Sequence, residues 1–525
     1  MSKTGTGKTN RRSFLGKMAG MALATALPAP TQNPSGQPSA TPNRSAAVSR
    51  RKRPPSVLFL MSDDMRTELA CYGSRFNVHS PNIDALASRG VRFDRNYCQF
   101  PLCGPSRSSL FSGHIPRETG VLGNGGAGVT STHPDWVTLP RLFRDSGYTT
   151  FRSGKLFHPS QDDRSAWMDF EDNERPSPNP ADAALRAKNQ RGTKMEIPRA
   201  QIPMPDGVLP PLPVDSQQAA YSDEIVVLEG NGEGHGDYAA VDRAIRMLNQ
   251  AAAMDKPFFV GCGVVKPHSP PTAPQKFFDM YDPAKMQLTP DFAAWPAVPK
   301  GWPRASIRPR NADLFIGRGA SEDEARQVIR AYVASISWAD WNLGRVIAEL
   351  DRLKLRDKTI IVFVTDHGYQ LGENGKWSKA GSLFEGGTRV PLIIDAPGML
   401  GNGRACTRMV QSLDIYRTLC ELAGLEPPSH VTGTSLVPLL QDPRGPKWDQ
   451  PAYSIWSEDG RTIHGTAVRT EKWRYAEYGK DAANGALLFD VHADPMELNN
   501  LASDASHSVV RTELSKLVNA YSYPA

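Results

Sequence analysis

The chain has 525 residues, of which 39% are hydrophobic and 22% are charged, so it can bury a large core and is not disordered throughout. Its formal net charge is +6, but residues 1–55 hold ten of the 61 lysines and arginines and none of the 55 acids. The rest of the chain is mildly acidic, at −4. The positive total is therefore no evidence for nucleic-acid binding, and we expect no nucleic-acid partner.

The N-terminal segment has the order of features that is typical of an export signal. The sequence NRRSFL at residues 10–15 is a twin-arginine pattern, a weakly apolar run follows at residues 18–27, and the small residues 24–26 are a cleavage candidate. We predict a twin-arginine signal peptide over residues 1–26, with a disordered basic tail as the alternative. Residues 27–55 are rich in Pro and Ser, end in a basic run, and are predicted to be a disordered linker.

This signal predicts a prokaryotic protein that is exported in the folded state to the periplasm or the cell exterior. The apolar run is too short to span a membrane, and no later segment has the roughly 18 uninterrupted apolar residues that a spanning helix needs. We therefore expect no membrane span.

Residues 56–445 alternate between short apolar runs and helical patterns. The runs at residues 56–61, 257–265, 359–365 and 391–394 are typical of buried strands in a mostly parallel sheet. Helices are predicted at residues 237–249 and behind a capping box that starts at Ser321. This alternation predicts a doubly wound α/β domain over residues 56–445.

Two regions depart from that alternation. Residues 171–236 are rich in Pro and polar residues and are predicted to be a long excursion. Beyond residue 445, short strands rich in Tyr and Trp are expected at residues 452–456 and 466–475. They predict a small antiparallel C-terminal subdomain over residues 446–525.

Acidic residues follow two of the predicted strands directly. Asp63 and Asp64 follow the first run, and Asp366 and His367 follow the run at residues 359–365. Open α/β sheets bind ligands at the carboxyl ends of their strands, and adjacent carboxylates repel each other unless a cation lies between them. Each pair alone could be a helix cap or a turn; together they predict a divalent-metal site. Carboxylate oxygens favour Ca²⁺, while the imidazole leaves Mg²⁺, Mn²⁺ or Zn²⁺ open.

The sequence CGPSRSSLFSG at residues 103–113 predicts a short helix with a cysteine at its first turn. Pro105 suits that first turn and Gly113 suits the end of the helix. Cys103 would then lie at a helix N-terminus, where a developing anion is stabilised. A buried structural cysteine is the alternative reading.

This segment matches the motif C-x-P-x-R, and the chain resembles the type I, formylglycine-dependent sulfatases of the alkaline-phosphatase superfamily. The resemblance is strongest to the iduronate-2-sulfatase branch and its bacterial relatives. Matching segments, spread over most of the chain, lie at residues 62–66, 71–73, 80–87, 103–113, 154–159, 266–270, 365–373, 377–379 and 488–502. The resemblance implies an alkaline-phosphatase-like fold and a sulfuric ester hydrolase, with Cys103 converted to formylglycine by a formylglycine-generating enzyme.

The resemblance also implies roles for individual residues. One Ca²⁺ would be held by an oxygen of the modified Cys103 and by the side chains of Asp63, Asp64, Asp366 and His367. The remaining catalytic set would be Arg107 and Lys155 to orient the hydrated aldehyde, His158 to take its proton, Lys266 and Lys379 to hold the sulfate oxygens, and His268 as the general acid. The nucleophile would be one hydroxyl of the formylglycine gem-diol. Taken singly, these lysines and histidines would be read as surface or structural residues.

The sequence is compatible with three functions. The first is a sulfatase that acts on a sulfated carbohydrate, such as a 2-O-sulfated uronic acid, with a neutral sugar sulfate or choline sulfate as other substrates. The second is a phosphoester or phosphonate hydrolase of the same superfamily. The third is a non-catalytic glycan-binding relative in which Cys103 is unmodified.

Overall fold

The computed structural model describes residues 53–170, 180–205, 224–445 and 447–523. The predicted signal peptide and almost all of the predicted linker lie outside the described residues. All remaining structural statements concern the described ranges.

A seven-stranded sheet forms the centre of the fold, with strand order β10-β2-β9-β8-β1-β6-β3. Its strands are β1 (Ser56–Asp63), β2 (Val91–Tyr97), β3 (Thr149–Gly154), β6 (Phe258–Pro267), β8 (Thr359–Thr365), β9 (Arg389–Asp395) and β10 (Ala405–Gln411). All neighbouring pairs are parallel except those that involve β9, which is antiparallel to both β2 and β8. The predicted doubly wound, mostly parallel α/β fold is therefore confirmed, although the run at residues 391–394 lies in its antiparallel strand.

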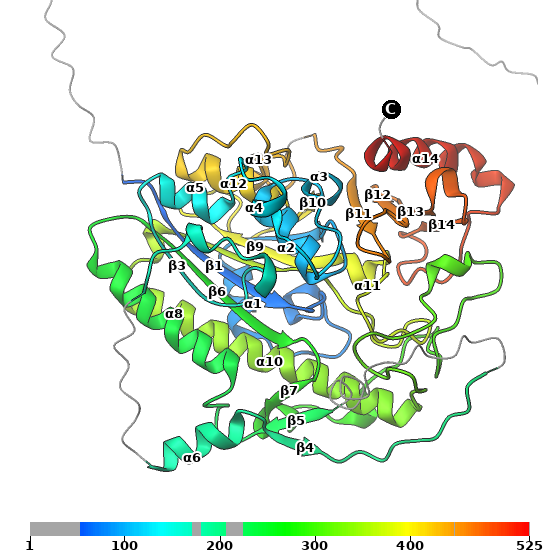
Figure 1. The fold of residues 1–525 in the computed structure, drawn as a ribbon, viewed down its shortest axis with the longest axis horizontal. Helices are drawn as coiled ribbons and strands as arrows, with labels where there is room; N and C mark the ends of the chain where they lie inside the picture. Colours follow the sequence, from blue (N-terminus) through cyan, green and yellow to red (C-terminus); the bar gives the residue numbers. More distant parts are fainter. Residues whose placement is uncertain (1–52, 171–179, 206–223, 446, 524–525) are drawn as a thin grey trace, which may run out of the picture. The chain divides into compact units, whose positions relative to one another are not determined.

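Helices cover both faces of this sheet (Figure 1). On one face, Leu58 and Leu60 of β1 pack in a core with α8 (Gly236–Ala253) and α10 (Glu322–Arg352). On the other face, the alternate β1 residues pack in a second core with helices α2 (Cys103–Ser112), α5 (Leu139–Asp145) and α12 (Asp414–Ala423). Because successive side chains of a strand point to opposite faces, one continuous apolar strand supplies both cores.

The two predicted helices form and extend further than their sequence patterns indicated. Ser321 and Glu324 make the predicted capping box, with the Ser321 hydroxyl accepting from the Glu324 amide at 3.3 Å. The shorter helices are α1 (Pro81–Ala87), α3 (Pro116–Thr119), α4 (Val129–Thr132), α6 (Pro180–Asn189), α9 (Gln275–Phe278), α11 (Glu385–Thr388), α13 (Val437–Gln441) and α14 (Ser508–Ser522). No helix in the described ranges combines the length and the apolar character that crossing a bilayer requires.

The described part of the excursion at residues 171–236 contains regular structure. Besides α6, it holds β4 (Thr193–Met195) and β5 (Ile225–Leu228). These two strands pair with each other, and β5 also pairs with β7 (Thr272–Pro274), so a small separate sheet forms beside α10.

The C-terminal part contains a four-stranded antiparallel sheet with α14 packed against it (Figure 1). Its strands are β11 (Ala452–Trp456), β12 (Gly465–Arg469), β13 (Trp473–Tyr478) and β14 (Ala486–Asp490). The single strand expected at residues 466–475 is wrong. A tight turn in which the Thr470 amide donates to the Trp473 carbonyl at 2.8 Å divides it into β12 and β13.

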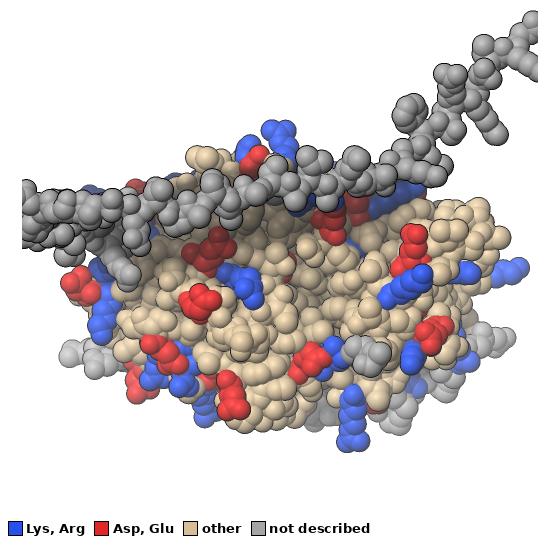
Figure 2. Space-filling model, turned by 90° about the horizontal axis from the view of Figure 1, so that it is seen from above, with Lys and Arg blue, Asp and Glu red and all other residues tan. Residues whose placement is uncertain are grey.

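Charged side chains on the face drawn in Figure 2 are mixed in sign. Basic and acidic side chains alternate there among uncharged ones. This is the pattern of an ordinary solvated surface rather than of a field of one sign.

A buried ion-pair cluster joins the C-terminal sheet to the rest of the fold. Arg474 of β13 is 2% exposed, lies 2.6 Å from Glu385 of α11 and 2.7 Å from Glu497, and donates to the Leu383 carbonyl at 2.8 Å. Burial alone would raise the pKa of Glu385, but Arg474 and then Arg469 hold it well below its usual value. Two guanidinium groups, those of Arg474 and Arg469, therefore compensate Glu385, and Arg474 also pairs with the buried Glu497.

We predict that Arg474→Met lowers the free energy of unfolding by about 3–5 kcal/mol, because it leaves buried negative charge without its partner. Lys472→Met is the matched control. Lys472 lies on the preceding turn, is half exposed and pairs with Asp490 at 3.2 Å, so its loss costs less than about 1 kcal/mol. Urea unfolding of both variants measures the difference, and equal losses would contradict the assigned role of the cluster.

Candidate active site

Eight of the predicted site residues lie at or after the carboxyl ends of four neighbouring parallel strands. These strands lie in the order β8-β1-β6-β3, and Ser62 of β1 pairs with Thr365 of β8, so the acidic residues that come next are neighbours. The residues delivered in this way are Asp366 and His367 after β8, Asp63 and Asp64 at the end of β1, Lys266 and His268 at and after the end of β6, and Lys155 and His158 after β3.

The acidic ends of β1 and β8 meet the start of α2. One ligand atom from each of Asp63, Asp64, Cys103 and His367 lies within 4.8 Å of the others, and all four residues are buried. Asp64 adopts a left-handed backbone with φ of 62°, and its Oδ1 atom is buried without a hydrogen-bond partner among the described residues. A buried carboxylate oxygen that has no hydrogen-bond partner, and that lies among further oxygen, nitrogen and sulfur atoms, fits a bound cation.

Asp366 adjoins this group, and its two oxygens already have partners. Its Oδ2 atom accepts from Arg107 Nε at 2.8 Å, and its Oδ1 atom accepts from the amides of His367 at 2.9 Å and Asp64 at 3.3 Å. These bonds fix the carboxylate beside the group without using all of its lone pairs. Asp366 can therefore still contribute an oxygen to a cation.

The two acids of β1 have opposite pKa shifts. Burial raises the pKa of Asp64 to about 7, although Lys379 opposes the shift. Burial acts on Asp63 as well, but Lys155 and Arg107 hold its pKa well below its usual value. Protein cations therefore compensate Asp63 more fully than Asp64, which leaves Asp64 as the acid that gains most from a metal ion.

His367 presents one nitrogen to the group. Its Nδ1 atom lies 3.0 Å from the Gly368 carbonyl, so it carries the proton that this bond needs. The Nε2 atom then has a free lone pair and lies 3.2 Å from Cys103 Sγ. A ligating histidine whose other nitrogen is held by a carbonyl is the usual arrangement in metal sites.

Cys103 begins α2, as the sequence predicted. The helix ends at Gly113, which has φ of 67°, and the Cys103 Sγ atom lies 3.4 Å from Asp63 Oδ1. Burial, and after it the charge of Asp63, raises the pKa of the thiol well above its usual value. An unmodified thiol here stays protonated and is a poor nucleophile.

Arg107 and Lys155 lie among the acids. Arg107 is fully buried; besides Asp366 it bonds the carbonyls of Lys155 at 2.6 Å and Leu156 at 2.7 Å. The Lys155 ammonium pairs with Asp63. Arg107 thus joins α2, the end of β8 and the segment after β3, and the geometry assigns it a structural task in addition to the polarising role expected from the sequence.

The segment after β6 carries Lys266 and His268. The Lys266 ammonium donates to the carbonyls of His268 and Pro270, both at 2.8 Å, so it holds its own loop. His268 is oriented by a contact of 2.7 Å between its Nδ1 atom and the Ser269 carbonyl. Burial, and after it Lys379, lowers the pKa of His268 to about 3, so its imidazole is neutral in the free site.

His158 is partly exposed near the same cations. Burial, followed by Lys155 and Arg107, lowers its pKa, which favours a neutral imidazole that can accept a proton. This state suits the proton-accepting role that the sequence predicted for it.

Lys379 lies on the opposite side of the group, where it meets a residue that the sequence did not indicate. Its Nζ atom is 2.9 Å from Asp64 Oδ2 and 3.0 Å from Asp313 Oδ1. Asp313 follows no predicted strand and belongs to no motif, so its sequence context held no signal. Only the approach of two distant loops places it here.

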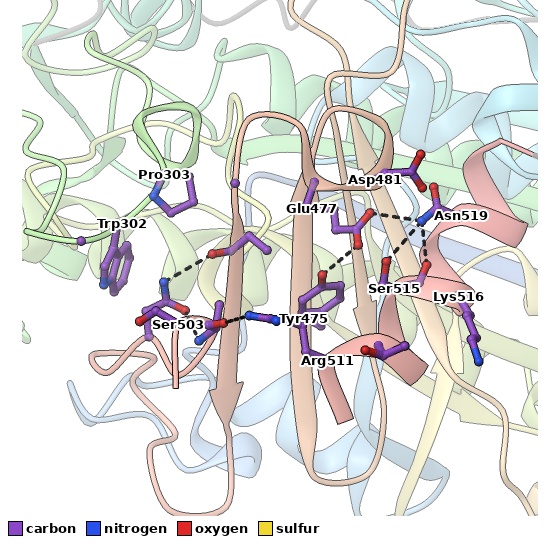
Figure 3. A pocket seen from close by; sticks show the side chains of 17 residues that line it. Trp302, Pro303, Tyr475, Glu477, Asp481, Ser503, Arg511, Ser515, Lys516 and Asn519 are labelled. Atoms are coloured by element: carbon purple, nitrogen blue, oxygen red, sulfur yellow. Dashed lines mark hydrogen bonds between the residues drawn. The ribbon is translucent and has the colours of Figure 1, made fainter. Parts of the chain in front are cut away.

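A separate cavity of about 850 Å³ lies between the loop at residues 301–303 and the C-terminal sheet with α14 (Figure 3). Trp302, Arg511 and Lys516 are among its lining residues, and Tyr475 donates to Glu477 at 2.8 Å inside it. None of the predicted catalytic or metal-binding residues lines this cavity, so it is separate from the site predicted around Cys103.

Comparisons with known proteins identify the family of the chain. The family model described as Sulfatase matches residues 55–425, and one described as N-sulphoglucosamine sulphohydrolase, C-terminal, matches residues 372–522. The chain is 29% identical to the iduronate 2-sulfatase of Mus musculus, over 86% of this chain and 91% of that protein. It is 30% identical to the choline-sulfatase of Rhizobium meliloti (strain 1021), over 88% and 85%.

Solved structures share the fold. A phosphonate monoester hydrolase of Agrobacterium radiobacter superposes with a TM-score of 0.66 at 23% identity, covering 89% of this chain and 95% of that chain. A protein solved with its substrate D-glucosamine-2-N,6-O-disulfate gives 0.64 at 22% identity, covering 89% and 97%. The sheet is alkaline-phosphatase-like, the family model matches most of the chain, and named sulfatases are among its relatives. The chain therefore belongs to the sulfatase family and is a sulfuric ester hydrolase.

Proposed function

We propose that this sulfatase removes sulfate from a sulfated carbohydrate, with Cys103 converted to formylglycine and one Ca²⁺ held beside it. The observation that supports the proposal best is the meeting of Cys103 with Asp63, Asp64 and His367, which come from three separate elements. The proposed ligands of the cation are these four residues and Asp366.

Both groups would supply chemistry that the encoded side chains lack. When bound, Ca²⁺ supplies fixed positive charge where negative charge grows on the sulfate oxygens in the transition state. When hydrated, formylglycine supplies one hydroxyl as the nucleophile toward sulfur and a second hydroxyl whose proton loss lets sulfate leave.

The protein's own cations would bind and orient the ester. Lys155 pairs with Asp63 and keeps two further donor hydrogens, and Lys379 pairs with Asp64 and Asp313 and keeps one, for sulfate oxygens or for residue 103. Arg107 would hold Asp366 and the backbone after β3 in place. Lys266 is assigned mainly to its loop, because two carbonyls already occupy its ammonium.

Two histidines would move the protons. His268 would donate a proton to the departing alcohol. The protonated form of His268 is disfavoured in the free site, but the negative charge of a bound sulfate ester favours that form. His158 would accept the proton from residue 103 when sulfate is released. Both roles need the histidine within hydrogen-bond reach of substrate or residue 103 in the complex.

Maturation and export form part of the same proposal. A formylglycine-generating enzyme would recognise the segment around Cys103 before the chain folds, because the structure buries that side chain. The twin-arginine pattern at residues 10–15 would then direct the folded enzyme out of the cytoplasm.

The substrate class is inferred from relatives of similar identity. One is named for iduronate, a sugar acid, and another for choline, at 29% and 30% identity. We favour a sulfated sugar because a further relative, from Bacteroides thetaiotaomicron, is named an N-acetylglucosamine-6-O-sulfatase. Choline sulfate is the competing substrate.

The function is tested by comparing the hydrolysis of a sulfate ester with that of the matching phosphate ester, and by measuring sulfate release from different sulfated substrates. We expect turnover of 4-nitrophenyl sulfate, weak or no turnover of 4-nitrophenyl phosphate, and sulfate release from at least one member of a panel of sulfated oligosaccharides. Ion chromatography measures the sulfate released from the oligosaccharides, and choline sulfate is assayed in the same way as the competing substrate. A strong preference for the phosphate would assign the chain to phosphoester chemistry instead, and glycan binding without turnover of any ester would indicate a non-catalytic protein.

The nucleophile is tested at Cys103. Mass spectrometry of the peptide that contains it should show sulfur replaced by oxygen with loss of two hydrogens. Cys103→Ser should lower kcat by more than about 1,000-fold, because a serine hydroxyl has no aldehyde through which sulfate can be expelled. Ca²⁺ affinity and the unfolding temperature should change little. Full activity with an unmodified cysteine would refute this mechanism.

The cation is tested at Asp64. Asp64→Asn should weaken Ca²⁺ binding by more than about tenfold, because it neutralises the carboxylate with the orphaned oxygen. Isothermal titration calorimetry measures the affinity, and chelation should lower the unfolding temperature of the parent protein but not that of the variant. Asp414→Asn is the control, since this buried carboxylate accepts only from backbone amides of Gln411 and Thr434. Equal Ca²⁺ affinity in both variants would place the cation elsewhere.

A further inference from the structure

We propose that Asp313 is a positioning residue for departure of the alcohol, which acts by holding the ammonium of Lys379 and by facing the imidazole of His268. This inference rests on the proposed function. It adds a carboxylate to the leaving-group side of the site, whereas the acids described above serve the cation.

The backbone brings Asp313 to the site by joining two loops that are far apart in the sequence. The loop at residues 310–314 runs beside the loop at residues 375–379. Four hydrogen bonds connect them: Lys376 Nζ to the Arg310 carbonyl at 2.6 Å, the Trp377 amide to Asn311 Oδ1 at 2.8 Å, Asn311 Nδ2 to the Gly375 carbonyl at 3.3 Å, and the Leu314 amide to the Trp377 carbonyl at 3.3 Å. Asp313 is therefore held opposite Lys379 by bonds that involve neither side chain.

The side chain of Asp313 is buried, at 8% exposure, and its two oxygens have different surroundings. Oδ1 lies 3.0 Å from Lys379 Nζ, while Oδ2 is buried and receives no hydrogen bond from the described residues. One ligand atom from each of Asp313, His268 and Asp64 lies within 4.8 Å of the others. The carboxylate of Asp313, one oxygen of which receives no hydrogen bond from the described residues, thus lies close to the proposed general acid.

This trio is not a second metal site. The ammonium of Lys379 lies within 3.0 Å of both Asp64 and Asp313, so the protein's own cation already occupies the position between these two carboxylates. Asp313 instead balances a lysine that would otherwise present its full charge to His268. Without it, Lys379 would disfavour positive charge on the imidazole more strongly.

The geometry of His268 explains how the carboxylate of Asp313 would help proton donation to the alcohol. Its Nδ1 atom is held by the Ser269 carbonyl at 2.7 Å, so the imidazole has a fixed orientation and only its other nitrogen can serve the alcohol. When that nitrogen carries a proton the ring is positively charged, and a buried carboxylate within 4.8 Å stabilises that charge. Asp313 therefore acts through His268 and Lys379 and need not contact the substrate.

The test compares two esters that differ in their need for a general acid. Phenyl sulfate releases a basic phenolate, whereas the nitro group of 4-nitrophenyl sulfate makes its phenolate a much better leaving group. In the mature, Ca²⁺-loaded enzyme, Asp313→Asn should lower kcat/KM about 100-fold for phenyl sulfate and at most about tenfold for 4-nitrophenyl sulfate. Any loss of sulfate binding through Lys379 affects both esters alike and cancels in the ratio.

Further variants separate positioning from folding. Asp313→Glu keeps the charge and should restore part of the phenyl sulfate rate. Asp291→Asn is the matched control. Asp291 accepts from the amide of Asn374, just before the same loop, and is not part of the cluster of Asp313, His268 and Asp64, so its replacement should change both rates equally. On a His268→Gln background, Asp313→Asn should produce no further change in the ratio of the two rates. Unfolding temperatures check that each variant is folded.

The outcomes are distinguishable from failure of the proposed function. If the parent enzyme hydrolyses neither ester, the sulfatase mechanism fails and the effect of Asp313 fails with it. If the parent is active and Asp313→Asn changes both rates by the same factor, or changes neither, the inference about Asp313 is overturned while the sulfatase mechanism stands. A change in the ratio that persists on the His268→Gln background would also overturn it.

Discussion

The site depends on compensation of negative charge that is buried at one edge of the sheet. Asp63, Asp64 and Asp366 are all at most 1% exposed, and carboxylates so close together in a medium of low polarity cannot all remain ionised without positive charge nearby. The chain supplies Arg107 and Lys155 on the Asp63 side and Lys379 on the Asp64 side. This supply is unequal, since Asp63 is held ionised while the pKa of Asp64 rises to about 7. The proposed Ca²⁺ would complete the compensation.

The same requirement organises the structure around the site. Arg107 reaches across from α2 to Asp366 and to the backbone after β3, and so ties three elements together. Lys379 is shared between Asp64 and Asp313, which links the acid of β1 to the loop before α10. Arg107 and Lys379 therefore each have two tasks, because each balances a carboxylate and holds a neighbouring segment in place. Substitutions of these lysines and arginines should consequently affect stability and activity together.

In the proposed mechanism the site divides into a nucleophile side and a leaving-group side. Residue 103, Lys155 and His158 surround the start of α2, where attack on sulfur and later release of sulfate would occur. His268, Lys379 and Asp313 lie on the other side, where the alcohol would depart. In the proposed mechanism the two histidines serve opposite proton transfers. Burial lowers the pKa of both, and the next largest influence is Lys155 on His158 but Lys379 on His268. Substrate recognition beyond the sulfate group is the task of loops, which differ most among enzymes that share a fold.

The sequence by itself determined the strands and the ligand types. Continuous apolar runs such as residues 359–365 are typical of strands buried on both faces, and the polar residues that follow parallel strands meet at one edge, since parallel strands all end on the same side. The motif around Cys103 likewise indicated a helix start, and its resemblance to sulfatases indicated the chemistry. Local patterns could not determine the antiparallel direction of β9, the turn that separates β12 from β13, or the place of Asp313. These features depend on contacts between segments distant in the chain, such as the bonds between residues 310–314 and 375–379, and only the tertiary structure decides them.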